Sequence, residues 1–193
     1  MSDTPKLESS DGRHRRAERS RARIIDALLA LVFAGNTTPN AEEVAVAAKV
    51  GIRSVFRHFK DMESLYREMA LRLEREFMAA AIPTFKSPDW RGKLDEMIER
   101  RFEVFERIAP YRRAADGYRF RSPTLQADIE KLNTFLRMRL LMIIPADIAT
   151  GDRFEALDAV LSFEGWNRLR QIQAHSPEVT RRVVDFLVKK LLD

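Results

Sequence analysis

Apolar residues recur at every third or fourth position through most of the chain, and this spacing predicts amphipathic helices. A first helix is expected from about Arg13 to Ala34, after a polar tail over residues 1–12 that we expect to be flexible. No segment keeps the period-two alternation that marks a half-buried strand. The pattern therefore predicts an all-α fold.

Two short helices joined by a tight turn are predicted within residues 40–59. Asn40 is an N-cap residue type, and Glu43 three positions later completes a capping-box pattern. Lys49-Val50-Gly51 supplies the break, since glycine turns the backbone most freely. The second helix starts at Ile52. Its inner, packing side is expected to hold Val55, Phe56 and Phe59, and its outer side the cationic and hydrogen-bonding Arg53, Ser54, Arg57 and His58. Such a helix suits the major groove of DNA, so the pattern indicates a helix-turn-helix.

The rest of the chain divides at the only stretch that has two prolines close together, Pro83 and Pro88. We expect a helix-turn-helix DNA-binding domain over residues 13–60, a connecting helix over 61–82 and a second domain over 83–193. In the second domain, apolar stripes and cap residues predict helices from Asp89 to before Pro110, Tyr111 to Phe120, Leu125 to Ile144, Phe154 to Ile172, and from Ser176-Pro177 to near the end.

The chain is mildly basic overall, with 34 Lys and Arg against 29 Asp and Glu. The basic residues are clustered, however: residues 12–23 hold six arginines and one acid, and residues 49–60 hold four basic residues and no acid. Clustered cations neutralise phosphates and release counterions, which favours DNA as the partner.

Other function classes find little support in the sequence. The chain has no cysteine, and His14, His58 and His175 lack metal-ligand spacing, so we expect no metal, no cofactor and no enzyme. The apolar run from Ile24 to Ala34 is interrupted by Asp26 and is too short to span a membrane, and the N-terminus lacks the apolar core of a signal peptide. We therefore expect a cytoplasmic protein with no membrane partner.

The chain resembles the tetracycline-repressor (TetR) family of bacterial one-component regulators over its whole length. The resemblance is carried by an alanine-rich first helix, a recognition helix with a Tyr-x-His-Phe-like end, the start of the next helix and a late segment: Ala45, Ala47, Ala48, Val50, Ser54 to Phe59, Glu63, Leu65 and LSFEGWNRLR at 161–170. It implies a three-helix DNA-binding unit, a connecting fourth helix, and a helical effector domain that ends in two dimerisation helices.

Four residues depart from the family pattern. Lys49 stands where the family usually has the turn glycine and Gly51 where it usually has a capping serine. These departures predict a rearranged turn and a recognition helix that lacks a side-chain cap worth ~1 kcal/mol. Phe56 and Met62 replace a tyrosine and a lysine that contact phosphate in the family, which predicts weaker DNA binding and a flatter salt dependence unless Lys49, Lys60 or the arginine-rich arm compensates.

DNA contacts are expected along both cationic clusters. Arg53 is the best candidate for a base contact, because arginine can bond guanine bidentately. Ser54 could bond a base or a phosphate, Arg57 is expected at the backbone, and the resemblance implies the same for His58. Residues at the start of the first motif helix would point its N-terminus at a phosphate. The full set is Arg13, Arg15, Arg16, Thr38, Asn40, Lys49, Gly51, Ile52, Arg53, Ser54, Phe56, Arg57 and His58.

By resemblance, the second domain should hold a cavity for a small-molecule effector. Candidate lining residues are Phe102, Phe105, Tyr118, Asn133, Phe135, Arg137, Met138, Met142 and Trp166. Ordinary core packing explains the apolar ones as well, and the polar ones could face water or a dimer partner.

The last two predicted helices carry more apolar surface than one small domain covers. These residues are Leu157, Leu161 and Leu169 on one helix, and Val183, Phe186 and Leu187 on the other. Pairing with a second copy would bury both stripes in a four-helix bundle. The sequence thus predicts a ligand-responsive repressor that binds a palindromic operator as a homodimer. The alternative is a basic helical adaptor without sequence-specific DNA binding.

Overall fold

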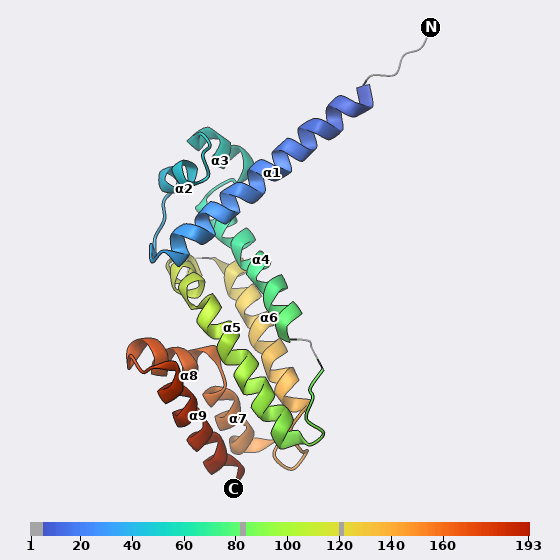
Figure 1. The fold of residues 1–193 in the computed structure, drawn as a ribbon, viewed down its shortest axis with the longest axis vertical. Coiled ribbons are helices and arrows are strands. Elements are labelled where there is room, and N and C mark those ends of the chain that lie inside the picture. The colour runs from blue at the N-terminus through green and yellow to red at the C-terminus, as the bar shows by residue number, and fades with distance from the viewer. Residues whose placement is uncertain (1–5, 82–83, 120–121) are drawn as a thin grey trace. The chain divides into compact units, whose positions relative to one another are not determined.

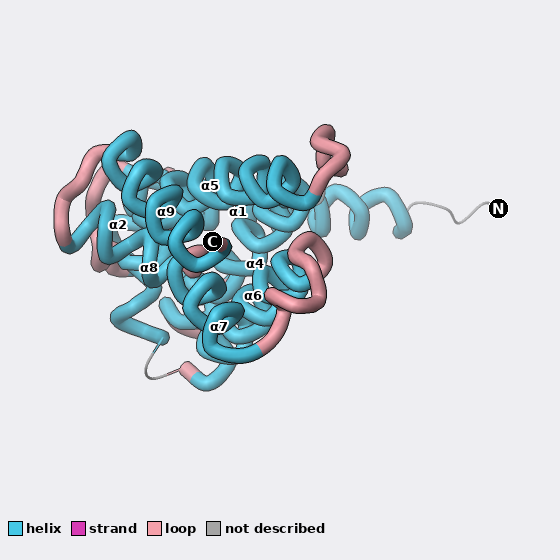
Figure 2. Tube along the Cα trace, turned by 90° about the horizontal axis from the view of Figure 1, so that it is seen from below, coloured by secondary structure: helices cyan, strands magenta, loops and turns pink. Residues whose placement is uncertain are grey.

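The computed structural model describes residues 6–81, 84–119 and 122–193, and every regular element within them is a helix (Figures 1 and 2). The elements are α1 (Lys6–Phe33), α2 (Ala41–Ala47), α3 (Ile52–His58), α4 (Met62–Ala81), α5 (Trp90–Arg119), α6 (Pro123–Leu141), α7 (Gly151–Val160), α8 (Phe163–Asn167), the π-helix η1 (Arg168–Ile172) and α9 (Pro177–Leu192). The all-α prediction is confirmed for this part of the chain. Across the same residues, no helix is long and apolar enough to cross a membrane.

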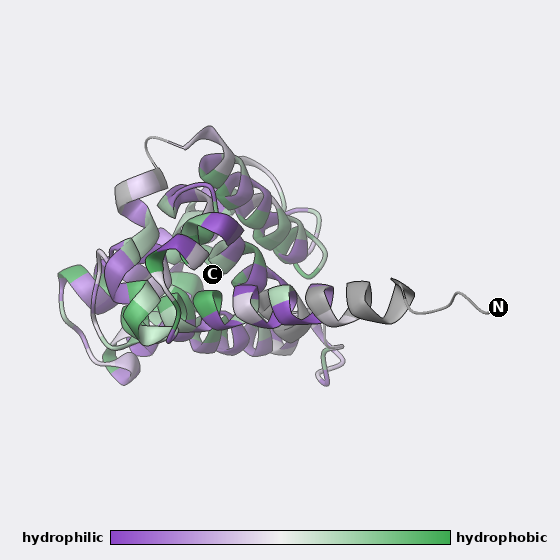
Figure 3. Cartoon of the chain, turned by 90° about the horizontal axis from the view of Figure 1, so that it is seen from above, coloured by the Kyte–Doolittle hydropathy of each residue, from purple (hydrophilic) through white to green (hydrophobic). Residues whose placement is uncertain are grey.

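Two compact units divide the chain, and each draws on two stretches of sequence. Unit 1 comprises residues up to Leu73 together with Pro110–Leu125, and unit 2 comprises Glu74–Ala109 and Gln126–Asp193. This division differs from the expected boundary at residues 82–83, because α4, α5 and α6 each contribute residues to both units. Most helices carry both hydrophilic and hydrophobic residues, as amphipathic helices do (Figure 3).

Helix α5 runs through Pro110, so the prediction that a helix ends before this proline is wrong. Proline has no N–H to donate to the carbonyl of Glu106, and the helix loses one hydrogen bond there. Burial on both sides keeps it continuous: Ala109 lies in a core cluster of unit 2 and Ala114 in the core of unit 1. The chain changes unit at Pro110 itself.

Helix α1 starts at Lys6, earlier than the predicted start at Arg13. The flexible tail expected over residues 1–12 thus becomes helix from residue 6, and residues 1–5 lie outside the described part. One local bond supports the early turns, because Arg16 Nε donates to the carbonyl of Gly12 at 3.1 Å. Among the α1 residues whose side chains are described, Gly12 and residues 14–33, the first buried one is Ile24, so the described residues before it pack against no core.

The core of unit 1 fastens α1 to the helix-turn-helix and to α4. Arg21 joins them, because its guanidinium lies 5.0 Å from the centre of the Phe59 ring and forms an ion pair with Glu68 at 2.7 Å. A second ion pair links Arg72 to Asp26. The fully or almost fully buried residues are Ile24, Leu28, Val32, Val44, Val55, Phe59, Leu65, Tyr66, Met69 and Ala114.

The predicted continuous helix from Phe154 to Ile172 is wrong, because the chain breaks after α7. Ser162 caps the following helix α8 by accepting a hydrogen bond from the N–H of Gly165 at 3.0 Å. A Cβ at Gly165 would lie 2.6 Å from the carbonyl oxygen of Ala159, so only glycine allows this close approach of backbone to backbone. The start of α9 is confirmed, since Ser176 accepts from the N–H of Val179 and Pro177 is in the first turn.

Candidate nucleic-acid interface and effector cavities

The turn of the helix-turn-helix keeps a tight geometry in spite of the lysine in it. Lys49 has a φ of +54°, the left-handed conformation that glycine adopts most easily. The N–H of Val50 donates to Ala45 O at 3.0 Å and the N–H of Lys49 donates to Val46 O at 3.1 Å, which is the Schellman pattern of a helix end. The predicted rearrangement is therefore wrong. A non-glycine residue carries the strain, at about 1–2 kcal/mol.

The capping box at the start of α2 is confirmed. The Asn40 side chain accepts from the N–H groups of Glu42 and Glu43 at 2.9 and 3.0 Å, and the Asn40 N–H donates to Glu43 Oε2 at 2.8 Å. These bonds occupy the groups of Asn40 that were expected to meet a phosphate, and they place a carboxylate there. Asn40 is therefore a cap, whereas Thr38 remains exposed beside it.

Helix α3 separates an inner from an outer side as the sequence predicts, except at Phe56, which was expected to pack but is 49% exposed. Val55 is buried, whereas Ile52, Arg53, Phe56 and Arg57 are exposed. Gly51 precedes the helix without a side-chain cap, as expected from the missing serine. Its φ of −73° is extended backbone that any residue adopts, so the left-handed turn is made by Lys49 and not by the glycine.

Arg53 and Arg57 differ in their local bonding. Arg57 donates to Ser54 Oγ at 3.3 Å, which places the hydroxyl of Ser54 within the cationic face. Arg53 has no hydrogen bond or ion pair among the described residues, so all its donors are open. The outer face of α3 can therefore donate to base edges and phosphates.

His58 is not placed as a phosphate contact in this conformation. Its Nε2 is buried and has no hydrogen-bond partner among the described residues. Burial, followed by the charges of Arg57 and Arg21, lowers the pKa of His58 below its ordinary value of 6.5. A neutral, half-buried imidazole supports the packing of α3 more directly than it binds an anion.

Cations also lie along the exposed half of α1. Arg15 and Arg16 are exposed there, whereas the side chain of Arg13 lies outside the described residues. Arg21 belongs to the same sequence cluster but is used inside unit 1, a role that the charge pattern alone did not reveal. Met62 is partly buried against the core, so the residue that replaces the family's lysine serves packing.

An open groove of about 460 Å³ in unit 2 contains two of the predicted effector residues, Phe102 and Trp166. Phe105 packs beneath them, with its ring centre 5.8 Å from that of Trp166. Four glutamates, Glu99, Glu103, Glu106 and Glu178, also line the groove. Its size suits a small molecule.

The other predicted effector residues lie elsewhere. Tyr118 belongs to unit 1, where its ring centre is 4.6 Å from that of Tyr66. Asn133, Met138 and Met142 are exposed. Arg137 forms ion pairs with Glu155 and Asp158, the latter at 3.0 Å, so its charge is used at the surface. Of the residues predicted to line one effector cavity, only Phe102 of α5 and Trp166 of α8 share the open groove.

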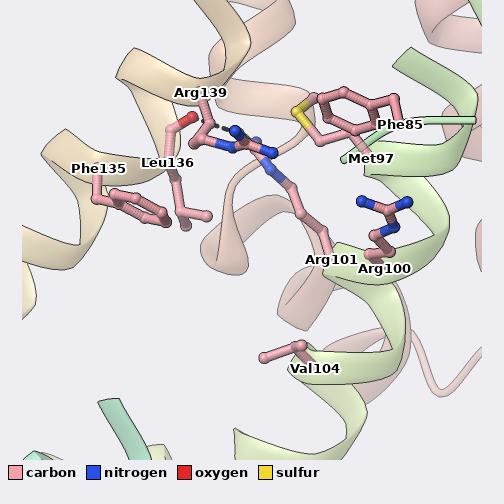
Figure 4. A pocket seen from close by; sticks show the side chains of 8 residues that line it. All are labelled: Phe85, Met97, Arg100, Arg101, Val104, Phe135, Leu136 and Arg139. Carbon is pink, nitrogen blue, oxygen red and sulfur yellow. Dashed lines mark hydrogen bonds between the residues drawn. The ribbon is translucent and has the colours of Figure 1, made fainter. Parts of the chain in front are cut away.

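A second, smaller cavity in unit 2 was missed, apart from one of its walls, Phe135 (Figure 4). Its basic residues are Arg100, Arg101 and Arg139, and Arg101 is almost fully buried. A signal did exist in the sequence: Arg101 follows Met97 by four residues and precedes Phe105 by four, so it lies on the apolar face of α5.

The predicted dimer residues divide into two groups. Leu157 and Leu161 are completely buried in the core of unit 2, so they cannot meet a second chain and this part of the prediction is wrong. Leu169 and Val183 are half-buried. On α9, Phe186 is 59% exposed and Leu187 37% exposed, which leaves apolar surface uncovered.

No protein-family model matches the chain, and no curated protein matches it in sequence. Solved structures do share its fold. A proposed transcriptional regulator from Streptomyces coelicolor A3(2) is 20% identical, with a TM-score of 0.60 over 88% of this chain and 98% of that one. A proposed TetR-family transcriptional regulator from Mesorhizobium loti is 21% identical, with a TM-score of 0.62 over 92% of this chain and 96% of that one. The chain thus has the all-α fold of TetR-family transcriptional regulators, as the resemblance in its sequence implied.

Proposed function

We propose that the protein is a DNA-binding transcriptional repressor that reads a palindromic operator as a homodimer and is released by a small molecule. The observation that carries this proposal is the outer face of α3. That face presents the open donors of Arg53 beside Arg57, on a helix whose inner side is fixed by the buried Val55. An enzyme is not expected, and the site of action is the cytoplasm, where the DNA lies.

The exposed residues of the helix-turn-helix have distinct roles in this proposal. Arg53 bonds a guanine, and Arg57 with Ser54 bonds the backbone or a neighbouring base. Ile52 and Phe56 are exposed apolar residues that suit thymine methyl groups. Gly51 lets the backbone approach the DNA closely. The remaining cations and Thr38 contact phosphates: Arg13, Arg15, Arg16, Lys49 and Lys60.

Dimerisation is supported by the uncovered apolar residues of α9, Phe186 and Leu187. Two copies related by a two-fold axis would bury these residues against each other. The pairing would also present two recognition helices to half-sites one helical turn apart, about 34–36 Å, or a multiple of that distance.

Effector release is supported by the groove of about 460 Å³ in unit 2. A ligand bound there can change operator binding only if it binds one arrangement of the dimer more tightly than the other. We propose that it favours an arrangement that does not fit the operator.

A mobility-shift titration tests this function against the adaptor alternative. The probe is the DNA next to the gene, and excess poly(dI-dC) competes for non-specific binding. If the protein is a regulator, the operator probe should keep its shifted complex in the presence of competitor. A control probe in which the inverted repeat is scrambled should not. Equal displacement of both probes by the competitor would instead favour a basic adaptor.

A further inference from the structure

One face of helix α5 gives the open groove of unit 2 most of its negative charge. Glu99, Glu103 and Glu106, with Phe102 among them, follow at spacings of three and four residues, so they share one side of the helix. Helices α8 and α9 complete the lining with Trp166, Pro177, Glu178 and Arg181 (Figure 1). The volume of about 460 Å³ accommodates a small organic molecule.

Two of the four glutamates are compensated by cations of the same unit. Glu106 accepts from Arg170 with both carboxylate oxygens. A hydrogen bond from Ser176 lowers the pKa of Glu178 below its ordinary value, and the charges of Arg170 and Arg182 act in the same direction. These two carboxylates therefore have cationic partners before any ligand binds.

Glu99 and Glu103 have no such partners. Both are exposed, and neither has a hydrogen bond or an ion pair among the described residues. The guanidinium of the lining, Arg181, bonds Asp95 at 3.3 Å and Asp185 at 2.7 Å instead. Like charges four residues apart on one helix repel each other. A cation beside Glu99 and Glu103 would be attracted by both carboxylates.

The aromatic part of the lining favours an organic cation. Phe102 is half-buried next to Glu103, and aromatic ring faces attract cations. Trp166 is 0% exposed and packs on Phe105 and Phe163, with ring centres 5.8 and 5.5 Å apart. Its buried Nε1 has no hydrogen-bond partner among the described residues, which is unfavourable for a donor. An oxygen atom of a bound ligand would supply the missing acceptor.

A metal ion suits the groove less well. Within the part of the chain that the structure describes, no three or more His, Cys, Asp or Glu side chains are grouped so that they could hold one. Calcium and magnesium require about six or more oxygen ligands in a compact shell. The groove instead offers two carboxylates without cationic partners beside aromatic rings, in a space much larger than one ion.

We propose that the groove binds a small organic amine in its cationic form, and that Glu99 and Glu103 hold the charge. The body of the amine lies against Phe102, and an oxygen atom in that body accepts a hydrogen bond from Trp166. The lining comes from three helices, so the ligand joins α5 to α8 and α9. Use of the amine as the effector rests on the proposed function, whereas its binding does not.

Isothermal titration calorimetry on the full chain without DNA tests the class of ligand. Phenoxyethylamine is compared with the neutral phenoxyethanol, with the anionic phenoxyacetate and with magnesium chloride, all at equal ionic strength. The amine should bind saturably and at least about tenfold more tightly than the other three. No saturable binding of the amine up to about 10 mM, or equal binding of phenoxyethanol, would overturn the proposal.

Phenylpropylamine tests the role of Trp166, because it has a methylene group in place of the ether oxygen of phenoxyethylamine. It should bind more weakly than phenoxyethylamine, since it offers the indole N–H no acceptor. Equal affinities of the two amines would show that Trp166 does not bond the ligand.

Variants assign the charge to its residues. Glu99→Gln with Glu103→Gln should weaken phenoxyethylamine at least about tenfold and leave phenoxyethanol unchanged. Both residues are exposed, so the fold should survive, as circular dichroism can check. The control is Glu130→Gln, at an exposed glutamate of α6 outside the groove lining. Equal amine affinities of the double variant and the control would refute the assignment. Operator binding is measured separately by mobility shift, so the absence of one activity does not count against the other.

Discussion

The recognition helix α3 of unit 1 and the interhelical contacts of unit 2 use arginine in opposite ways. On α3 in unit 1, Arg53 is exposed and has no partner among the described residues. In unit 2, Arg137 and Arg170 are bound to carboxylates of other helices, Arg170 to both oxygens of Glu106. An exposed ion pair such as that of Arg137 with Glu155 contributes about 0–1 kcal/mol. The number of arginines therefore says little about function.

Arg101 is the exception within unit 2, because it is buried and yet incompletely bonded. Its position in the interior of unit 2 sets it apart from Arg53, whose exposed side chain suits a large, hydrated polyanion.

The largest expected effect comes from breaking the dimer. Phe186→Asp with Leu187→Asp should give monomers, because two charges replace the apolar surface on α9. Operator affinity should then fall towards the non-specific level, roughly 10³-fold or more. Light scattering measures the assembly and mobility shift measures the affinity. A monomeric double mutant that binds the palindrome with undiminished affinity would contradict the dimer proposal.

The comparison of arginines is tested directly by Arg53→Ala and Arg137→Ala. Arg53→Ala should cost ~1–3 kcal/mol in specific operator binding and relax preference at particular base pairs, with little change in stability. Arg137→Ala should leave operator binding unchanged and lower the free energy of unfolding by about 1 kcal/mol or less. Competition binding measures operator affinity, and urea unfolding measures the free energy of unfolding. Weaker operator binding by Arg137→Ala, with none for Arg53→Ala, would contradict the roles given to these two arginines.

Deleting residues 1–18 should weaken binding to all DNA sequences. The exposed Arg15 and Arg16, with Arg13, would no longer reach phosphates, and the salt slope should fall by about one for each phosphate that is no longer neutralised. The fold should survive, since no residue of α1 before Ile24 is buried among those whose side chains are described. Circular dichroism checks the fold; an unchanged salt slope would show that the arm does not touch DNA.

The turn offers a smaller effect, on stability. Lys49→Gly should raise the free energy of unfolding by about 1 kcal/mol, because glycine adopts the left-handed φ of +54° without strain. Part of the gain is offset by the greater freedom of glycine in the unfolded chain. Lys49→Ala is the matched control, since alanine keeps the strain while the charge is removed. A stabilised Lys49→Ala with no further gain in Lys49→Gly would mean that charge, and not strain, is the cause.

The smallest expected effect is a pH dependence from His58. Its folded pKa lies below 6.5, so the unfolded chain takes up a proton first as the pH falls. Its contribution to stability is therefore present above about pH 6.5 and is lost as the pH falls from there towards the folded pKa. His58→Gln should reduce the difference in unfolding free energy between pH 8 and pH 5.5. An unchanged difference would show that the imidazole titrates alike in both states.

Local signals in the sequence predicted the structure well. The capping box at Asn40 and the Ser176-Pro177 start need only residues within one turn, and both are present. The inner and outer faces of α3 follow from helical periodicity in the same way, apart from the exposed Phe56. Such features depend little on the rest of the fold.

Features decided by distant contacts were not predictable in this way. Helix α5 passes Pro110 because residues on both sides are buried in different units. An apolar stripe in the sequence does not show whether the same chain or a second chain covers it, so Leu157 and Leu161 are predicted at a dimer surface but lie in the core of unit 2. The burial of Arg101 likewise depends on carbonyls 35 and 60 residues away.

The break at Ser162 and Gly165 has a consequence for the ancestry of this fold. The backbone of α7 leaves no space for a side chain at Gly165, whereas Glu164 beside it faces solvent. Mutation can change exposed positions freely, but any larger residue at Gly165 requires the backbone to move. Distant relatives should therefore retain a serine or another cap residue followed three positions later by glycine, after most surrounding positions have diverged. That pair would trace the lineage of unit 2 where overall identity no longer does.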